Sequence, residues 1–164
     1  MEKRVNLLKF KIKYFIIAIV IIAVDLYSKH YANTHLNFAQ PYEITSFFNL
    51  TLLYNYGAAF SFLSNDQTSW QLIMFACISL IAAIVLIVMI IRQPTTAKLN
   101  LISFSMILGG ALGNFYDRAF RGFVIDFLDF HISDYHWPAF NVADSAITCG
   151  VILLVLASFF TKKS

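Results

Sequence analysis

Two aspartates border apolar sequence in the last third of the chain. Asp126 lies in the segment VIDF, and Asp144 begins the run DSAITCGVILLVLASFF. A charge at the centre of a membrane helix costs about 2.5–3.5 kcal/mol, and less near the interface. Two carboxyl groups that meet cannot both ionise, so they share a proton and can serve as acid and base toward a water molecule. The alternative is that Asn141 or Asp144 caps the helix that follows.

Asp129 is a second candidate for the first carboxyl position. If residues 124–129 are extended, Asp126 shares a face with Val124 and Leu128, whereas Asp129 points the other way. If they are helical, both acids share one face. The residues themselves leave both conformations open.

His131, Asp134 and His136 raise the question of a metal site. Zinc prefers three or four His, Cys or carboxylate ligands at characteristic spacings, and this segment has neither an H-E-x-x-H motif nor a Cys pair. We therefore interpret these residues as polar loop residues and expect neither a metal nor another cofactor.

Asp25 and Lys29 stand four residues apart, so a helix makes them neighbours on one face. Charges within a membrane segment mainly compensate one another, which predicts an ion pair. A role in orienting a site is the alternative.

Gly109 and Gly113 have the spacing that lets another helix backbone come close. Asn114, Asp117 and Arg118 follow at the same helix end and could face a site. Helix packing and a polar site are compatible readings of this segment.

Membrane-spanning elements must position these side chains. The chain has 164 residues, of which 59% are hydrophobic and 13% charged, outside the usual balance of a soluble domain. A span needs about 20 apolar residues, and four stretches qualify, at about 14–33, 69–91, 99–117 and 141–160. We predict an all-α membrane protein, a bundle of four transmembrane helices in one domain over residues 1–164.

The first apolar stretch follows five basic residues, as in a secretory signal peptide. It lacks an A-x-A-type cleavage site and continues into the sequence DLYSK, so we predict a retained span. Nine of the twelve Lys and Arg residues lie in the amino-terminal tail, the 92–98 turn or the carboxyl tail. The positive-inside rule therefore predicts that both termini are cytoplasmic. Most acids lie at the opposite ends of the spans, so the net charge of +3 does not indicate nucleic-acid binding.

Residues 34–68 are rich in β-branched and aromatic residues, which predicts short strands after Pro41, on the extracytoplasmic side against the membrane at headgroup level. Cys77 and Cys149 fall inside predicted spans. We expect both to pack as small apolar side chains and to form no disulfide.

Several motifs occur together in a characteristic order. They are Asp25, N-Y-G-A-A-F at 55–60, G-G-A-L-G-N-x-x-D-R at 109–118, V-I-D-F at 124–127 and F-N-V-A-D-S at 140–145. In this order, and over nearly the whole chain, they resemble the bacterial lipoprotein signal peptidases, also called signal peptidase II.

The resemblance implies an aspartic endopeptidase of the bacterial inner membrane. Its expected substrates are prolipoproteins, cleaved just before a diacylglyceryl-modified cysteine, and globomycin-type cyclic peptides are expected inhibitors. The implied fold adds a small extracytoplasmic β-cradle and an outer interfacial helix to the four membrane helices. The implied catalytic pair is Asp126 and Asp144; the implied substrate-binding or supporting residues are Asn55, Gly109, Asn114, Arg118, Asn141, Ala143, Asp25 and Lys29.

Two other classes of function compete with a peptidase. A transporter or channel would use its membrane acids as an ion path, but the acids cluster at one face and form no relay across the bilayer. An assembly or chaperone protein would grip partner helices through the Gly109 and Gly113 face and would tolerate carboxylate-to-amide changes.

Overall fold

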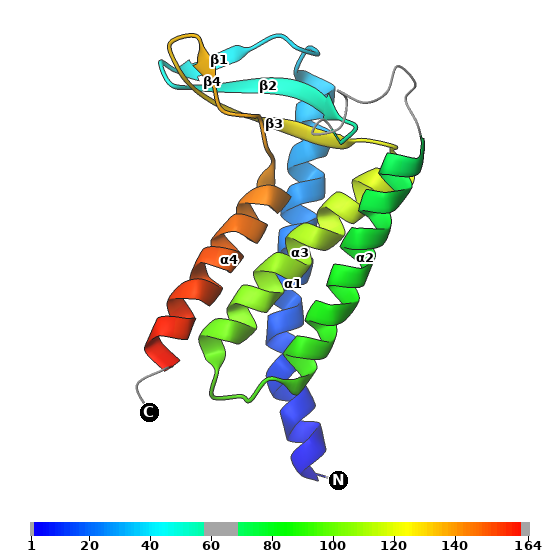
Figure 1. Cartoon of the computed structure of the whole chain (residues 1–164), viewed down its shortest axis with the longest axis vertical. Coiled ribbons are helices and arrows are strands. Elements are labelled where there is room, and N and C mark those ends of the chain that lie inside the picture. Colours follow the sequence, from blue (N-terminus) through cyan, green and yellow to red (C-terminus); the bar gives the residue numbers. More distant parts are fainter. Residues whose placement is uncertain (1, 58–68, 162–164) are drawn as a thin grey trace.

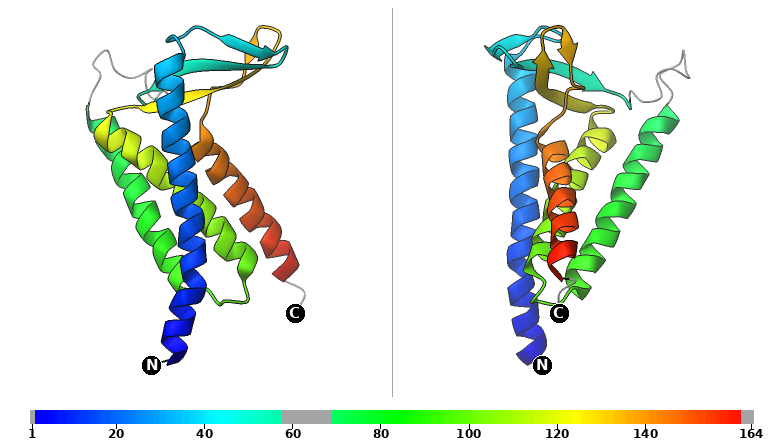
Figure 2. Two further views of the ribbon diagram at one scale, coloured as in Figure 1. Left: turned by 180° about the vertical axis from the view of Figure 1, so that it is seen from behind. Right: turned by 60° about the vertical axis from the view of Figure 1, so that its left-hand side comes forward.

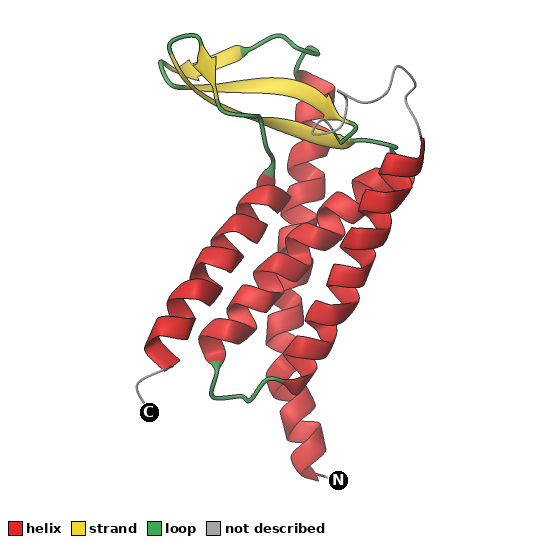
Figure 3. Cartoon of the chain, viewed as in Figure 1, coloured by secondary structure: helices red, strands yellow, loops and turns green. Residues whose placement is uncertain are grey.

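A computed structural model describes residues 2–57 and 69–161. The elements in chain order are α1 (Glu2–His35), β1 (Tyr42–Thr45), β2 (Phe48–Asn55), α2 (Ser69–Arg92), α3 (Lys98–Phe120), β3 (Val124–Ile132), β4 (Tyr135–His136) and α4 (Val142–Thr161). The helices form a bundle, and the strands form a sheet across one end of it (Figure 1, Figure 3). The turn joining α2 to α3 lies at the other end (Figure 2).

Three helices are long and apolar enough to cross a membrane within the residues that the structure describes. They cover Leu72–Arg92, Lys98–Phe120 and Val142–Phe159, and confirm three of the four predicted stretches as apolar helices. The predicted first span, 14–33, lies within the 34-residue helix α1, and its crossing of the membrane stays a prediction. Over 2–57 and 69–161 the helices are α1 to α4, so the expected outer interfacial helix has no counterpart there.

Helix α3 is central and packs against the three other helices. Gly109 is the reason that α1 comes close, because a Cβ there would lie 2.9 Å from the carbonyl oxygen of Ala18. The close backbone approach predicted from the glycine spacing is therefore confirmed. Apolar side chains of α1, α2 and α3 fill the core below it: Tyr14, Ala18, Ala83, Leu86, Ile90, Leu101, Phe104 and Leu108.

The amino-terminal part of α1 is fastened to the end of α2. The Lys11 ammonium donates to the carbonyl oxygens of Ile91 and Gln93, the latter at 2.8 Å. These carbonyls have no partner within the helix, so a buried cation there caps α2 and suits the negative end of its dipole.

The four strands form one antiparallel sheet in the order β1-β2-β3-β4. Strands β1 and β2 confirm the strands predicted after Pro41. Strand β3 covers both acids of the VIDFLDF segment, which settles the open choice in favour of an extended conformation. Asp126 and Asp129 therefore face different partners.

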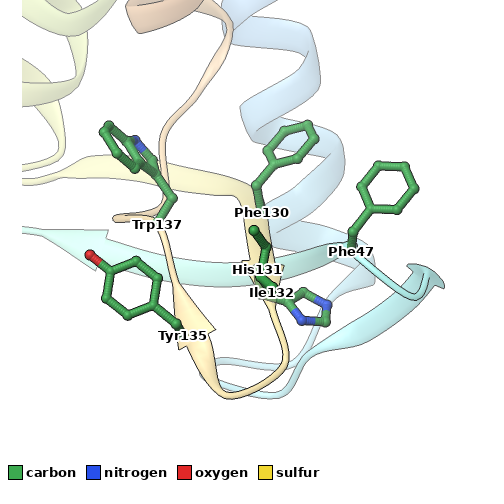
Figure 4. Close-up of a pocket in the computed structure, with 6 residues that line it drawn as sticks. All are labelled: Phe47, Phe130, His131, Ile132, Tyr135 and Trp137. Atoms are coloured by element: carbon green, nitrogen blue, oxygen red, sulfur yellow. The ribbon is translucent and has the colours of Figure 1, made fainter.

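The far end of the sheet has an apolar groove of about 490 Å³ (Figure 4). Six residues line it: Phe47, Phe130, His131, Ile132, Tyr135 and Trp137. The rings of Phe47, Phe130 and Trp137 project toward the side of the sheet on which the helices lie (Figure 4).

Cys77 and Cys149 are free thiols on exposed helix surfaces.

Candidate active site

Asp144 lies in the first turn of α4, where it takes part in a reciprocal cap. The side-chain oxygen of Asn141 accepts the backbone N–H of Asp144 at 2.9 Å, and Asp144 Oδ2 accepts the backbone N–H of Asn141 at 3.3 Å. This is the capping-box arrangement with Asn and Asp in the two positions. The predicted cap is therefore present, and the same geometry fixes the Asp144 carboxylate at the helix N-terminus, where the dipole favours a negative charge.

Asp126 projects from β3 toward the same end of α4. Its Oδ1 accepts the side-chain N–H of Asn141 at 2.7 Å, and its Oδ2 accepts the side-chain N–H of Asn55 at 3.0 Å. Asn141 thus touches both acids, one through its amide nitrogen and the other through its amide oxygen and backbone. Strand pairing places Asn55 there, because its partner Val124 is two residues from Asp126.

The electrostatic environment of Asp126 favours its neutral form. The side chain is 3% exposed. Burial raises its pKa from 3.8 to about 6, the charge of Asp144 adds to the rise, and the hydrogen bonds from Asn55 and Asn141 oppose it. A carboxyl with this pKa can carry or release a proton near neutral pH.

Asn114 in α3 is the second amide that reaches Asp144. Its Nδ2 donates to Asp144 Oδ1 at 2.7 Å, and its Oδ1 accepts the Lys29 ammonium at 2.9 Å. Its Oδ1 also accepts the side-chain N–H of Asn141 at 3.3 Å. Because both ends of the amide have charged partners, its orientation is set.

A buried charge network supports these amides from behind. The Lys29 ammonium lies 2.7 Å from Asp25 Oδ2 and 2.9 Å from Asp117 Oδ2, and all three side chains are fully buried. The predicted Asp25–Lys29 ion pair is thus confirmed. Asp25 Oδ1 also accepts the backbone N–H of Ala143 at 2.8 Å, which ties α1 to the start of α4.

Of three other expected site residues, Gly109 lies away from the acids, Arg118 lies near both, and Asn55 donates to Asp126 as described above. Gly109 packs against α1 at Ala18 and Ile21 and has no described contact with either acid. Arg118 stacks over Phe75 at 5.5 Å and donates weakly to the carbonyl oxygen of Asn114. Of the N-Y-G-A-A-F motif, the structure describes Asn55, Tyr56 and Gly57. Residues 58–60 lie outside the described residues.

Asp129 belongs to a separate cluster. It accepts hydrogen bonds from Thr51 Oγ1 at 2.8 Å and from His136 Nδ1 at 2.7 Å. Burial raises its pKa, but the bonds from His136 and Thr51 outweigh this, and its pKa lies below the ordinary value. Of the residues considered for a metal, His131 stacks on His136 at 4.9 Å between ring centres.

Asp117, which the sequence indicated only as a residue that could face a site, is not among the site residues that the resemblance implies. The signal was available, since Asp117 follows Asn114 by three residues and so lies on the same helix face. Asp117 looked like one of several polar residues at a helix end, and its contact with Lys29 depends on the packing of α1 against α3.

The arrangement can perform acid–base hydrolysis. Two carboxyl groups from β3 and α4 both accept hydrogen bonds from Asn141, one from its side chain and one from its backbone N–H, and the amides of Asn55 and Asn114 hold them from other sides. Burial raises the pKa of Asp126 to about 6, and Asp144 lies at a helix N-terminus. Such a pair can deprotonate a water molecule and protonate a departing amine.

Comparison with known proteins identifies the family. A family model described as Signal peptidase (SPase) II matches residues 17–160. A lipoprotein signal peptidase of Francisella tularensis subsp. novicida is 75% identical over 158 residues, covering 96% of this chain and 98% of the relative. One of Acinetobacter baylyi is 46% identical, covering 90% of this chain and 82% of the relative.

Solved structures agree with this assignment. Two bacterial membrane enzymes determined by the in meso method, at 1.9 and 2.3 Å resolution, are similar to this chain. The first has a TM-score of 0.78 with 34% identity, covering 88% of this chain and 91% of the other; the second has 0.79 with 32% identity, covering 92% and 90%. The chain belongs to the signal peptidase II family.

Proposed function

We propose that Asp126 and Asp144 are the catalytic pair of this signal peptidase. The protein is a lipoprotein signal peptidase and therefore a protease that removes signal peptides from prolipoproteins. The observation that carries the residue assignment is that Asn141 donates to both carboxyl groups, to Asp126 through its side-chain amide and to Asp144 through its backbone N–H. The bond to be cut is the one before the diacylglyceryl-modified cysteine, whose acyl chains stay in the bilayer.

The two acids have different roles at the start of the reaction. Asp144 is the base, because the helix N-terminus and the Asn114 amide both favour its ionised form. Asp126 is the acid, because burial raises its pKa to about 6, so it binds a proton more readily near neutral pH than an ordinary carboxyl does. Asp144 takes a proton from the water that attacks the peptide carbonyl, and Asp126 gives its proton to the carbonyl oxygen. The proton on Asp144 then passes to the leaving amine as the C–N bond breaks, and a hydroxyl of the gem-diol intermediate returns a proton to Asp126 as the product carboxyl group forms.

The side chains around the pair keep this geometry. Asn55 and Asn141 donate to Asp126, and Asn114 donates to Asp144, so neither carboxyl can turn without losing a bond. Arg118 is half-buried beside the pair and is suited to hold a peptide carbonyl of the substrate. Globomycin-type peptides would inhibit by lodging between the two carboxyls.

The membrane arrangement completes the proposal. Helix α1 crosses the membrane with the three apolar helices, both termini are cytoplasmic, and the sheet lies at the outer face of the inner membrane. The amino-terminal end of α1 and the turn joining α2 to α3 lie opposite the sheet (Figure 1). Both carry Lys and Arg residues, which supports this orientation. The aromatic groove on the helix side of the sheet suits the headgroup region (Figure 4).

The experiment uses purified protein in lipid and two forms of one prolipoprotein. The diacylglyceryl-modified form should be cleaved to a product that begins with the lipid-bearing cysteine, as read by mass spectrometry. The unmodified form should be cleaved far more slowly, and a chelator should leave the rate unchanged. Equal cleavage of both forms would show that the enzyme does not recognise the diacylglyceryl group. Cleavage that a chelator stops would contradict the carboxyl mechanism.

A further inference from the structure

Asp117 is a fully buried carboxylate for which the mechanism above has no use. It lies in the last turn of α3, one turn after Asn114, and its side chain is 0% exposed. A buried charge is costly unless its partners compensate it. Its partners therefore indicate what it does.

One line of contacts runs from Asp117 to Asp144. Asp117 Oδ2 lies 2.9 Å from the Lys29 ammonium, which donates to Asn114 Oδ1 at 2.9 Å. That contact keeps the amide oxygen of Asn114 toward Lys29 and its NH₂ toward Asp144. If the amide turned over, its NH₂ would face the ammonium, so the position of Lys29 decides which way Asn114 donates.

A second line runs from Asp117 to Asp126. Asp117 Oδ2 accepts the backbone N–H of Ile125, the residue before Asp126, at a long 3.4 Å. The backbone carbonyl of Asp117 accepts the N–H groups of Arg121 and Gly122 at 2.8 and 3.1 Å, which ends α3. Gly122 has a φ of +81°, and the chain turns there into β3. Asp117 thus also fixes the start of the strand that carries Asp126.

The charges around Asp117 balance. Asp25 and Asp117 are negative, and Lys29 and Arg121 are positive; Arg121 contacts Asp117 Oδ1 from the more exposed side. Removing the charge of Asp117 leaves Lys29 paired with Asp25, and it leaves Arg121 with access to water. The substitution Asp117→Asn is therefore compatible with folding.

We propose that Asp117 is a positioning residue for both catalytic carboxyls, acting on Asp144 through Lys29 and Asn114 and on Asp126 through the start of β3. This inference rests on the proposed catalytic pair. Its contacts touch neither the acids nor a space open to substrate, so it acts on kcat and not on KM.

The kinetic test compares Asp117→Asn with Arg121→Gln. We expect kcat to fall by roughly 100-fold in Asp117→Asn, the scale of a misplacement by about 1 Å, with little change in KM and a shifted pH profile of kcat/KM. Arg121→Gln should cause only a small fraction of that loss. In an Asn114→Ala background, Asp117→Asn should lower kcat by a much smaller factor, because the contacts that join Asp117 to Asp144 through Asn114 are already absent. A wild-type kcat and pH profile in Asp117→Asn, or a full loss in both backgrounds, overturns the proposal.

Amide hydrogen exchange tests the same inference without catalysis. In Asp117→Asn, exchange should quicken in residues 123–126 and 141–145 and stay unchanged in residues 83–90 of α2; Arg121→Gln should show neither change. Unchanged exchange in the first two segments overturns the proposal even if the catalytic assignment is right, whereas cleavage by Asp126→Asn refutes only the catalytic pair. If Asp117→Asn does not fold, Asp117→Glu carries both tests: it keeps the charge but lengthens the side chain, and wild-type kinetics and exchange would again overturn the inference.

Discussion

The substitution Asp126→Asn should make the protein more stable near neutral pH while it removes activity. In the folded protein the pKa of Asp126 is raised from 3.8 to about 6, so ionisation is harder in the folded chain than in the unfolded one. Between these two values the folded chain binds more protons, and stability falls as the pH rises. Asparagine cannot ionise, so the variant lacks this loss.

The magnitude follows from the gap between the two pKa values. Each pH unit corresponds to about 1.4 kcal/mol, which gives about 3 kcal/mol of unfolding free energy lost from pH 4 to pH 7. Against this, the NH₂ of the new amide must face a donor of Asn55 or Asn141, which costs one hydrogen bond, about 1 kcal/mol at every pH. The variant should therefore be about 1 kcal/mol less stable near pH 4 and about 2 kcal/mol more stable near pH 7.

The assay is unfolding by SDS in mixed micelles, followed at several pH values for wild type and variant. Asp129→Asn is the matched control on the same strand. Because the pKa of Asp129 lies below its ordinary value, its carboxylate stabilises the fold above that ordinary value and stops doing so as the pH falls. Asp129→Asn should thus lose stability near pH 7. A difference between wild type and Asp126→Asn that does not change with pH would refute the reasoning.

Three further predictions concern the supporting structure. Gly113→Ala should lower stability by about 1–3 kcal/mol in the same assay, because the new Cβ would lie 2.5 Å from Asp25 Oδ2; an unchanged midpoint would contradict this. Lys11→Met should lower the thermal midpoint yet leave kcat unchanged, because the caps it removes lie at the end of the bundle opposite the acids; a loss of kcat in the folded variant would be the opposite result. In Trp70→Phe protein in vesicles, the fluorescence of Trp137 should be quenched by lipids brominated near the headgroup and poorly by aqueous acrylamide, and efficient acrylamide quenching would place the groove in water.

The apolar helices could be predicted well from sequence, because about 20 apolar residues in a row have few other uses. Helix α1 is longer than the predicted 14–33 at both ends. Hydropathy marks only the part of a helix that lies in hydrocarbon. The helix itself can continue beyond the hydrocarbon, because its backbone hydrogen bonds form within the helix. The conformation of the segment around Asp126 could not be predicted, since an apolar run of a few residues fits both the helical period of 3.6 and the strand period of 2.

The site was only partly predictable. The acids were found because a carboxylate beside an apolar stretch is rare, and the resemblance selected Asp126 over Asp129. The contacts of Asn141 with Asp126, and of Asn114 with Asp144, join residues 15 and 30 positions apart. Such contacts depend on how α3, β3 and α4 pack, so local spacing could not predict them. For the same reason the contact of Asp117 with Lys29, which comes from the first helix, was not predicted.

The central claim is that Asp126 and Asp144 together perform the hydrolysis. The most direct measurement is the rate at which Asp126→Asn, Asp144→Asn and Asp129→Asn cleave a diacylglyceryl-modified prolipoprotein, each variant shown to be inserted and folded. We expect the first two to lose at least about 100-fold in rate, and Asp129→Asn to cleave at close to the wild-type rate. Normal cleavage by either of the first two, or a loss confined to Asp129→Asn, would contradict the claim.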